Sequence, residues 1–370
     1  MENFSTYVGL DVHKDSIDVS LAEAGRTGEV RHYGKIASDL RSVDSLIGKL
    51  KRPATTLRVV YEAGPSGFPL YRHLRARGVD CIVVSPSMIP KRPGDRIKTD
   101  RRDSASLARL HRAGELRAIY VPTEQDEAVR DLVRAREDAV HDRRRARQRL
   151  KSFLLRHGIA YPARADWTRR HRNWLADRGF AFPAQQIAFQ EYIESINETD
   201  ARVERLTEEL HKLVPTWSRA AVVEALQVLK GISFVTAVTL VAEVGVFSRF
   251  DKPRPLMAFL GLVPSEHSTG QTRRLGAITK AGNTHVRRVL AEAAWCYRPR
   301  AGIGRRLLAR QEALPKELRD ISWKAQLRLC GRFRSMAARL KPTPKIATAV
   351  ARELLGFVWD VARRVEADIH

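Results

Sequence analysis

Strand and helix patterns alternate over residues 7–110, and their order constrains the fold more than any other feature of the sequence. Short apolar or alternating stretches predict strands over 7–11, 16–23, 30–36, 57–64 and 79–86. Apolar residues at helical spacing predict helices over 40–50, 68–78 and 103–110. The first three strands are joined by short turns and are expected to form an antiparallel meander. This order indicates an α/β domain built on a mixed sheet.

Four acidic residues fall at the ends of these elements. Asp11 ends the first strand, Glu62 lies near the end of the fourth, and Asp100 and Asp103 share one face of a helix start. Each has an ordinary alternative role, because Asp is common in turns and at helix N-termini. Together they occupy the positions at which a ribonuclease H-like sheet gathers carboxylates from its first strand, its fourth strand and a later helix. We therefore predict a site for Mg²⁺, which prefers oxygen ligands.

The formal net charge of +24, from 66 Lys and Arg against 42 Asp and Glu, is the strongest bulk signal. A field of this size attracts a polyanion, and nucleic acid is the expected partner. Charge alone also fits a protein that only coats nucleic acid. No uncharged apolar run approaches the ~18 residues of a membrane span. No export signal is visible, and Cys81, Cys296 and Cys330 are far apart, which favours a soluble cytoplasmic protein.

A middle segment, expected over 124–215, is helical and rich in arginine. Its first helix carries a dense basic run that is either a solvated face or a phosphate-binding surface: Arg143, Arg144, Arg145, Arg147, Arg149 and Lys151. Its second helix has apolar residues in alternating steps of three and four from Phe189 to Leu213. This heptad pattern predicts a coiled coil, formed either within the chain or with a second protomer.

The last segment, expected over 216–370, is mainly helical. Gly231 opens and Gly245 closes a helix that resembles part of a helix-hairpin-helix element, in which turn amides meet a phosphate. A packing hairpin explains the same glycines.

A polar stretch then places Ser268 and Thr269 before Gly270, and we interpret it as a loop. Five cations follow it: Arg273, Arg274, Lys280, Arg287 and Arg288. A serine in such a place is ordinarily a turn residue. Beside this many phosphate-binding cations it is also a candidate nucleophile toward a phosphodiester.

Several of these stretches strongly resemble the IS110/IS1111 family of insertion-sequence transposases. They are YVGLDVHKDSIDVSLAE, VVYEAGPSGF and IKTDRRDSASLARL near the N-terminus, and GLVPSEHSTGQTRRLGAITKAGNTHVRRVLAEAAW further along. The resemblance covers most of residues 5–298 in the family's order and spacing. It implies a RuvC-like DEDD domain over 1–123, a coiled-coil connection and a C-terminal transposase domain.

The resemblance also implies roles for particular residues. The family's four carboxylates correspond to Asp11, Glu62, Asp100 and Asp103. Its serine nucleophile, which links covalently to DNA, corresponds to a loop that reads HSTG here rather than SG. Counting back from Lys280 favours Ser268, whereas counting forward from Pro264, or adjacency to the glycine, points to Thr269. We select Ser268 because the family's nucleophile is serine.

The resemblance implies a function as well: a DNA recombinase that mobilises an insertion sequence, guided by the element's own noncoding bridge or seek RNA. Family members assemble as dimers and tetramers, with the acidic domain of one subunit meeting the serine domain of another. Two alternatives stay open from the residues alone. One is a RuvC-like nuclease that uses metal-activated water, and the other is a noncatalytic nucleic-acid-binding protein.

Overall fold

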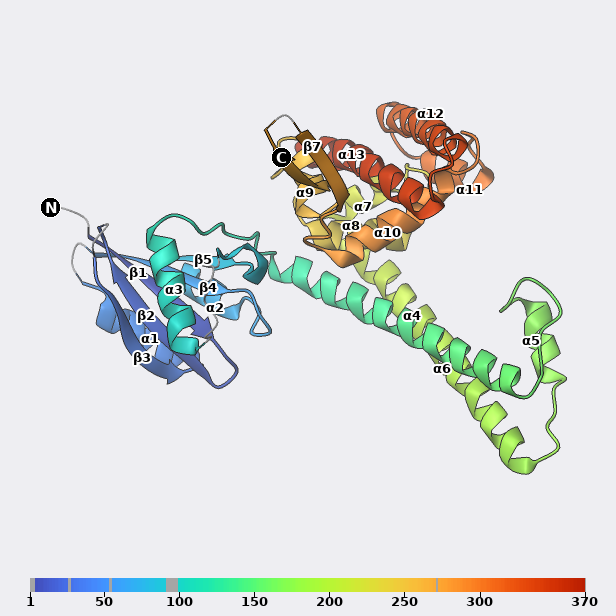
Figure 1. The fold of residues 1–370 in the computed structure, drawn as a ribbon, viewed down its shortest axis with the longest axis horizontal. Coiled ribbons are helices and arrows are strands. Elements are labelled where there is room, and N and C mark those ends of the chain that lie inside the picture. Colours follow the sequence, from blue (N-terminus) through green and yellow to red (C-terminus); the bar gives the residue numbers. More distant parts are fainter. Residues whose placement is uncertain (1–3, 26–27, 53–54, 91–98, 271, 370) are drawn as a thin grey trace. The chain divides into compact units, whose positions relative to one another are not determined.

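The computed structural model describes residues 4–25, 28–52, 55–90, 99–270 and 272–369 (Figure 1). The chain divides into two compact units, Met1–Val121 and Pro122–His370. Their buried apolar residues form separate clusters, as expected of units that each have a core of their own. The expected segments 124–215 and 216–370 both lie in the second unit.

The first unit contains a five-stranded mixed sheet with the strand order β3-β2-β1-β4-β5. Strand β1 pairs antiparallel with β2 and parallel with β4, β2 pairs antiparallel with β3, and β4 pairs parallel with β5. The strands are β1 (Phe4–Val12), β2 (Ser16–Glu23), β3 (Val30–Ala37), β4 (Thr55–Glu62) and β5 (Asp80–Val84). The predicted meander and mixed sheet are confirmed, and the first and fourth strands lie side by side.

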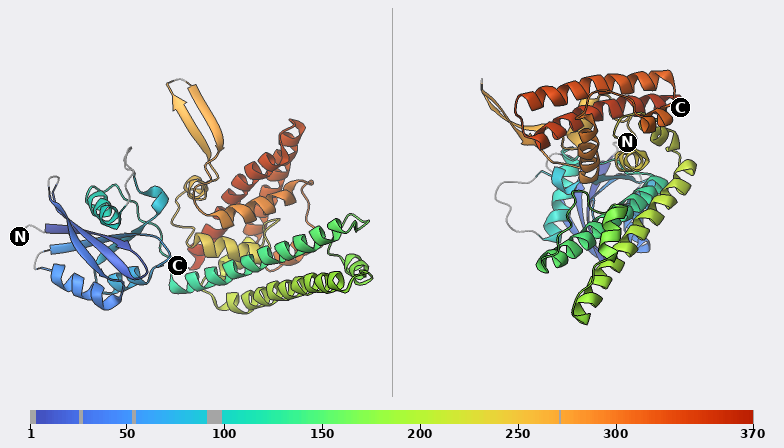
Figure 2. Two further views of the ribbon diagram at one scale, coloured as in Figure 1. Left: turned by 60° about the horizontal axis from the view of Figure 1, so that its bottom comes forward. Right: turned by 90° about the vertical axis from the view of Figure 1, so that its right-hand side faces the viewer.

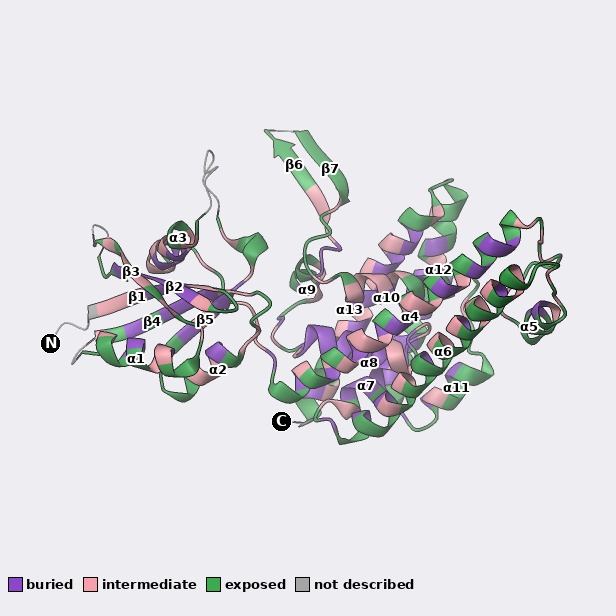
Figure 3. Ribbon diagram, turned by 90° about the horizontal axis from the view of Figure 1, so that it is seen from below, coloured by how far each residue is buried: buried purple, intermediate pink, exposed green. Residues whose placement is uncertain are grey.

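Helices cover both faces of this sheet. They are α1 (Leu40–Leu50), α2 (Pro69–Ala76) and α3 (Asp100–Arg112), with a short 3-10 helix at Pro86–Met88. Helices α1 and α2 pack with Val8, Leu10 and Tyr61 on one face, whereas Leu107 of α3 packs with Val60 and Val84 on the other. Both faces of β2 are buried, because α3 packs against the face that points away from α1 and α2 (Figure 3).

Helix α3 lies unusually close to β1 because β1 has a glycine at the crossing point. A Cβ atom on Gly9 would lie 2.2 Å from the Ser104 carbonyl oxygen and 2.5 Å from the Ala108 nitrogen. Nearby, the buried hydroxyls of Ser20 and Ser104 are hydrogen-bonded at 2.8 Å. The glycine therefore sets the distance between the sheet and the helix that carries Asp100.

We expect Gly9→Ala to lower the free energy of unfolding by about 1–3 kcal/mol, because the new methyl group meets backbone atoms that cannot rotate away. Gly48→Ala is the matched control. Gly48 lies inside α1, and a Cβ atom added there would meet nothing within 4 Å, so alanine should stabilise the protein by up to about 1 kcal/mol. Urea denaturation measures both changes. Equal effects of the two substitutions would contradict the proposed close approach.

The second unit is mainly helical, as predicted. Its helices are α4 (Glu124–Arg156), α5 (Arg169–Ala176), α6 (Pro183–Leu213), α7 (Ala220–Leu226), α8 (Phe234–Val244), α9 (Pro253–Phe259), α10 (Thr284–Ala294), α11 (Arg305–Gln311), α12 (Lys316–Ala338) and α13 (Thr343–Ile369). Short 3-10 helices lie at Val214–Thr216 and Trp295–Tyr297, and two strands, β6 (Pro264–Thr269) and β7 (Thr272–Ile278), form a hairpin. In the described part of the chain, no helix is long and apolar enough to span a membrane.

The long helices α4 and α6 pack side by side and run antiparallel (Figures 1 and 2). Arg136 of α4 donates to Thr207 of α6, and Arg147 of α4 donates to Asp200 of α6. Alternate heptad positions of α6 are buried: Phe189, Ile196, Val203 and Leu210. The other heptad positions are only partly buried, and the side chain of Leu213 is 50% exposed. The coiled coil itself stays a prediction.

Glycines bound α8 as the sequence indicated. Gly231 precedes the helix with φ 85°, and Gly245 ends it with φ 74°. A Cβ atom on Gly231 would lie 2.6 Å from the Ala293 carbonyl oxygen of α10, so this turn packs tightly inside the second unit. The packing role of the turn is thus evident, and its use as a helix-hairpin-helix phosphate site stays a prediction.

Candidate functional site

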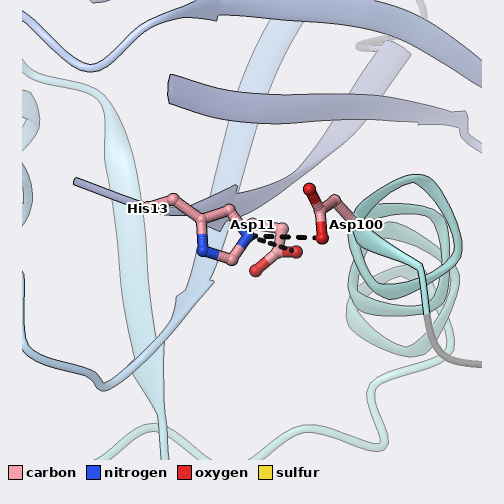
Figure 4. Close-up of side chains that lie close together, drawn as sticks. All are labelled: Asp11, His13 and Asp100. Carbon is pink, nitrogen blue, oxygen red and sulfur yellow. Dashed lines mark hydrogen bonds and ion pairs between the residues drawn. The ribbon is translucent and has the colours of Figure 1, made fainter. Parts of the chain in front are cut away.

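Three side chains from the first unit come together at the C-terminal end of the central strand β1 (Figure 4). Asp11 lies near the end of β1, His13 follows it, and Asp100 opens α3. The Nε2 atom of His13 lies 3.2 Å from Asp11 Oδ2 and 3.5 Å from Asp100 Oδ1. One ligand atom from each residue falls within 4.8 Å of the others, which is a spacing that one metal ion can bridge. Sequence reasoning identified the two carboxylates but missed the histidine.

Glu62 stands on the same face of the sheet as Asp11. Strands β1 and β4 are parallel, and their register pairs Leu10 with Tyr61, so the next residues on each strand are Asp11 and Glu62. Glu62 pairs with Val84, whose side chain packs against α3, and alternation along β4 therefore directs Glu62 toward that helix. Among the described residues, the group whose ligand atoms lie within 4.8 Å of one another includes neither Glu62 nor Asp103.

Asp103 lies three residues along α3 from Asp100, and both belong to the first turn of the helix. Thr99 caps this helix by accepting a hydrogen bond from the Arg102 backbone nitrogen, so the two aspartates are not needed for that role. Burial raises the pKa of Asp11, the nearby His13 opposes this shift, and the charges of Asp103 and Asp100 raise the pKa further. The mutual repulsion of these carboxylates is what a bound cation would relieve.

A fifth acidic residue, Asp18, also faces α3 and was missed by sequence reasoning. It pairs directly with Asp11 across the β1–β2 ladder, and it is only 4% exposed. Lys35 Nζ lies 3.2 Å from Asp18 Oδ2 and 3.6 Å from Asp100 Oδ2. Lys35 therefore approaches one oxygen of Asp100 while the other oxygen faces His13. The register of the short β1–β2 turn is the signal from which this pair could have been predicted.

The residues expected to form a polar loop form a β-hairpin instead, so that expectation is wrong. Ser268 lies in β6 opposite Arg273 in β7, and Gly270 at the turn has φ 55°, a conformation in which glycine is favoured. The Ser268 hydroxyl donates to Glu266 Oε1 at 2.8 Å, and the Arg273 guanidinium donates to both oxygens of Glu266 at 2.9 and 3.1 Å. Hydrogen bonds from Arg273 and then from Ser268 hold the pKa of Glu266 below its usual value, so Glu266 is ionised.

Strand geometry separates the two candidate nucleophiles onto opposite faces of the hairpin. Side chains alternate along β6, so Glu266 and Ser268 share one face, and His267 and Thr269 share the other. The register pairs His267 with Arg274 and Thr269 with Thr272. His267 therefore lies on the face opposite the Ser268 hydroxyl.

The two predicted nucleic-acid contacts on α10 also have partners inside the protein. Arg287 donates from one terminal nitrogen to the carbonyl oxygens of Leu260, Ala281 and Gly282. Arg288 contacts Glu137 and Glu292. These contacts tie the start of α10 to its surroundings, and a phosphate-binding role for either arginine stays a prediction. Lys280 and Arg274 are exposed.

The five arginines of the basic run in α4 divide into two groups. Arg143 and Arg147 lie 3.6 and 2.8 Å from Asp200 of α6, and they help to join the two helices. Arg144, Arg145 and Arg149 are exposed. A hollow of about 380 Å³ on this surface is lined by Arg145, Gln148, Arg149, Ser152, Phe153, Arg156 and Tyr192. A second, of about 280 Å³, is lined by Val140, Arg143, Arg144, Arg147, Gln148, Lys151 and Trp167.

Comparison with known families gives matches in both units. The DEDD transposase model of the IS110 type matches residues 8–159, and the transposase model of the IS116/IS110/IS902 family matches residues 223–307. The first match contains Asp11, Glu62, Asp100 and Asp103, and the second contains the β6–β7 hairpin.

Similar proteins include the "Putative transposase y4qE" of Sinorhizobium fredii, which is 48% identical over 357 residues, covering 96% of this chain and 88% of the relative. The transposase for insertion sequence element IS1533 of Leptospira borgpetersenii is 32% identical over 339 residues, covering 90% and 97%. The transposase for insertion sequence element IS1111A of Coxiella burnetii is 24% identical over 245 residues, covering 64% of each. High identity over nearly the full length, with family matches in both units, shows that this chain belongs to the IS110 family of transposases.

Proposed function

We propose that this transposase is a cytoplasmic, RNA-guided DNA recombinase that mobilises an insertion sequence through serine attack on DNA phosphodiesters and strand exchange. The observation that carries the proposal is the approach of Asp11 and Asp100 at a sheet edge that Glu62 also faces, with Asp103 on the same helical turn. Acidic residues in this arrangement suit a divalent cation, which the carboxylate oxygens indicate to be Mg²⁺.

Asp11, Glu62, Asp100 and Asp103 would hold the metal in this proposal. A bound divalent cation supplies charge stabilisation at the phosphate that is being attacked. Within the protein, burial of Asp11 and its repulsion from Asp100 and Asp103 favour the uptake of a cation. The capped start of α3 and its close contact with Gly9 fix Asp100 and Asp103 relative to β1. A site that is held in place before substrate binds loses little free energy in ordering itself.

Ser268 is the proposed nucleophile. Its Oγ would form a bond to phosphorus while the bond to the leaving DNA oxygen breaks, which conserves the energy of the phosphodiester in a phosphoserine link for rejoining. Glu266 accepts the Ser268 hydrogen bond and is itself held by Arg273, so the hydroxyl has a defined orientation. The exposed position of the hairpin suits a nucleophile that must reach DNA bound by another subunit of a dimer or tetramer.

The exposed arginines of α4 are proposed to bind phosphates of DNA or RNA. Phe153 and Tyr192 line the same hollow as Arg145 and Arg149, so aromatic rings and cations occur together there, as in sites that bind single strands. The partly exposed half of the α6 heptad, by contrast, is proposed as a contact between protomers.

Removing the two cations in Arg145→Ala/Arg149→Ala should weaken nucleic-acid binding by roughly tenfold or more and reduce the salt dependence of affinity by about two counterions. Lys316→Ala is the control, because Lys316 is exposed on α12 and pairs with Asp320 at 2.7 Å. Fluorescence anisotropy over a range of salt concentrations measures both quantities. An unchanged salt slope in the double variant would remove this hollow from the proposed interface.

RNA guidance is tested by the RNA that the protein retains. We expect the purified full chain to carry a noncoding RNA encoded by its own element, and we expect recombination between element-end and target DNA to need that RNA. Sequencing of the copurified RNA identifies it, and removal followed by re-addition measures the dependence. Recombination at the full rate after complete removal of RNA would exclude RNA guidance and leave a transposase that selects DNA directly.

A further inference from the structure

We propose that His13 is a nitrogen ligand of the metal held by Asp11 and Asp100, and that this ligand raises the affinity of the site for Mn²⁺ relative to Mg²⁺ when the two ions compete. The inference rests on the proposed metal function and deepens it, because the four predicted ligands are all carboxylates. It assigns a chemical role to a residue that follows Asp11 by only two positions.

The spacing of the three donor atoms supports a shared ion. Neighbouring ligands of an octahedral ion with bonds of about 2.1 Å lie about 3 Å apart. The corresponding distances here are 3.2 Å from His13 Nε2 to Asp11 Oδ2 and 3.5 Å from His13 Nε2 to Asp100 Oδ1. Small side-chain rotations are enough to bring three donors of this kind onto one ion. Figure 4 shows the imidazole directed toward both carboxylates.

The backbone holds His13 in this place. Its nitrogen donates to the Ser16 carbonyl oxygen at 2.9 Å in the short connection between β1 and β2. Strand β1 is in turn fixed between β2 and β4, so the histidine is attached to the central strand of the sheet. A ligand on a short, hydrogen-bonded turn is positioned more precisely than one on a long loop.

The oxygens of Asp100 are already divided between two partners. Lys35 Nζ approaches Oδ2 at 3.6 Å, whereas His13 approaches Oδ1. Lys35 cannot act as a ligand while protonated, because an ammonium group has no free electron pair. A neutral imidazole does have one, and its other ring nitrogen can carry the proton. His13 therefore supplies the nitrogen atom in this cluster that suits metal binding.

The kind of metal follows from the donor set. Mg²⁺ prefers oxygen ligands and keeps several waters, whereas imidazole nitrogen suits transition metals. A site with two carboxylates and one imidazole binds Mn²⁺ better, relative to Mg²⁺, than an all-carboxylate site does. Both ions fit the cluster, and the imidazole increases the affinity for Mn²⁺ relative to that for Mg²⁺.

Pulsed electron paramagnetic resonance of Mn²⁺ bound to the full chain tests the inference directly, without any measurement of activity. We expect ¹⁴N modulation from a directly bound imidazole, replaced by the ¹⁵N pattern when the protein is labelled with ¹⁵N-histidine. His13→Ala should lose this signal and should need about tenfold less Mg²⁺ to displace Mn²⁺. His73→Ala is the matched control, because His73 also contacts a carboxylate, Asp44, at 2.7 Å, but lies outside the cluster.

The outcomes separate the inference from the proposed function. If Asp11→Asn abolishes Mn²⁺ binding but the wild-type ion shows no histidine nitrogen, His13 is only a hydrogen-bonding neighbour, and the carboxylate metal site stands without it. The same conclusion follows if His13→Ala leaves the nitrogen signal and the Mg²⁺ competition unchanged. If Mn²⁺ binding is unaffected by Asp11→Asn, the proposed metal site itself fails, and the inference fails with it.

Discussion

Replacing Asp11 with asparagine is expected to lower recombination by roughly a thousandfold while leaving the fold intact. A metal ion stabilises a phosphoryl-transfer transition state by several kcal/mol, and about 4 kcal/mol corresponds to three powers of ten in rate. Asparagine keeps the size of the side chain but removes the charge that holds the ion. The effect is measured as the rate of recombination between element-end and target DNA at saturating divalent metal.

The melting temperature of Asp11→Asn distinguishes a loss of recombination through the metal site from a loss through unfolding. Burial raises the pKa of Asp11 and the charges of Asp103 and Asp100 raise it further, so the ionised side chain lowers the stability of the metal-free protein above that pKa. A neutral asparagine removes this cost, and we expect the metal-free variant to melt at the wild-type temperature or slightly above it.

Asp15→Asn is the control for this experiment. Asp15 is exposed between β1 and β2, and it does not belong to the group of Asp11, His13 and Asp100 whose ligand atoms lie within 4.8 Å of one another. Undiminished recombination in Asp11→Asn would remove metal catalysis from the proposed function. Undiminished recombination in Asp103→Asn would lead to the same conclusion, whereas the noncatalytic alternative predicts that the wild-type protein itself does not recombine DNA.

The sheet and the placement of its acidic residues could be predicted because they depend on local patterns. Strand alternation and turn residues identified the strands of the first unit, and their order implied which ones would be neighbours. Asp11 and Glu62 come to the same edge because parallel strands end on the same side. A spacing of three residues placed Asp100 and Asp103 on one helical turn.

The residues that were missed depend on register and on distant partners. Asp18 faces Asp11 only because the β1–β2 turn sets a particular register, and a shift by one residue would turn its side chain to the other face. His13 meets Asp100 across 87 positions of sequence (100 minus 13). The partners of Arg287 are backbone oxygens of a separate turn, which no local pattern in its own helix reveals.

The sequence of the hairpin indicates a loop because its two strands lack the usual apolar face. Most of its residues are exposed on both faces of the strands. The alternation of apolar and polar residues that usually marks a strand is therefore missing. The distinction affects chemistry. A loop would leave Ser268 and Thr269 equivalent, whereas a strand directs them to opposite faces and gives only Ser268 the hydrogen bond to Glu266.

Ser268→Ala is expected to abolish the covalent protein–DNA adduct and to reduce recombination below about one thousandth of the wild-type level, because no other group replaces a missing nucleophile. The variant should fold normally, since Ser268 is exposed and a substitution there changes stability by less than about 0.5 kcal/mol. The adduct is measured by trapping on a nicked DNA substrate, followed by denaturing electrophoresis.

Thr269→Ala is the matched control, because it removes a hydroxyl one residue away on the opposite face of the hairpin. We expect this variant to keep the adduct. Loss of the adduct in Thr269→Ala with retention in Ser268→Ala would transfer the nucleophile to the threonine. Nicking by both variants without any adduct would instead indicate metal-activated water, the chemistry of a RuvC-like nuclease. The hydrogen bond from Ser268 to Glu266 favours Ser268 as the nucleophile, because it gives that hydroxyl a fixed direction before DNA arrives.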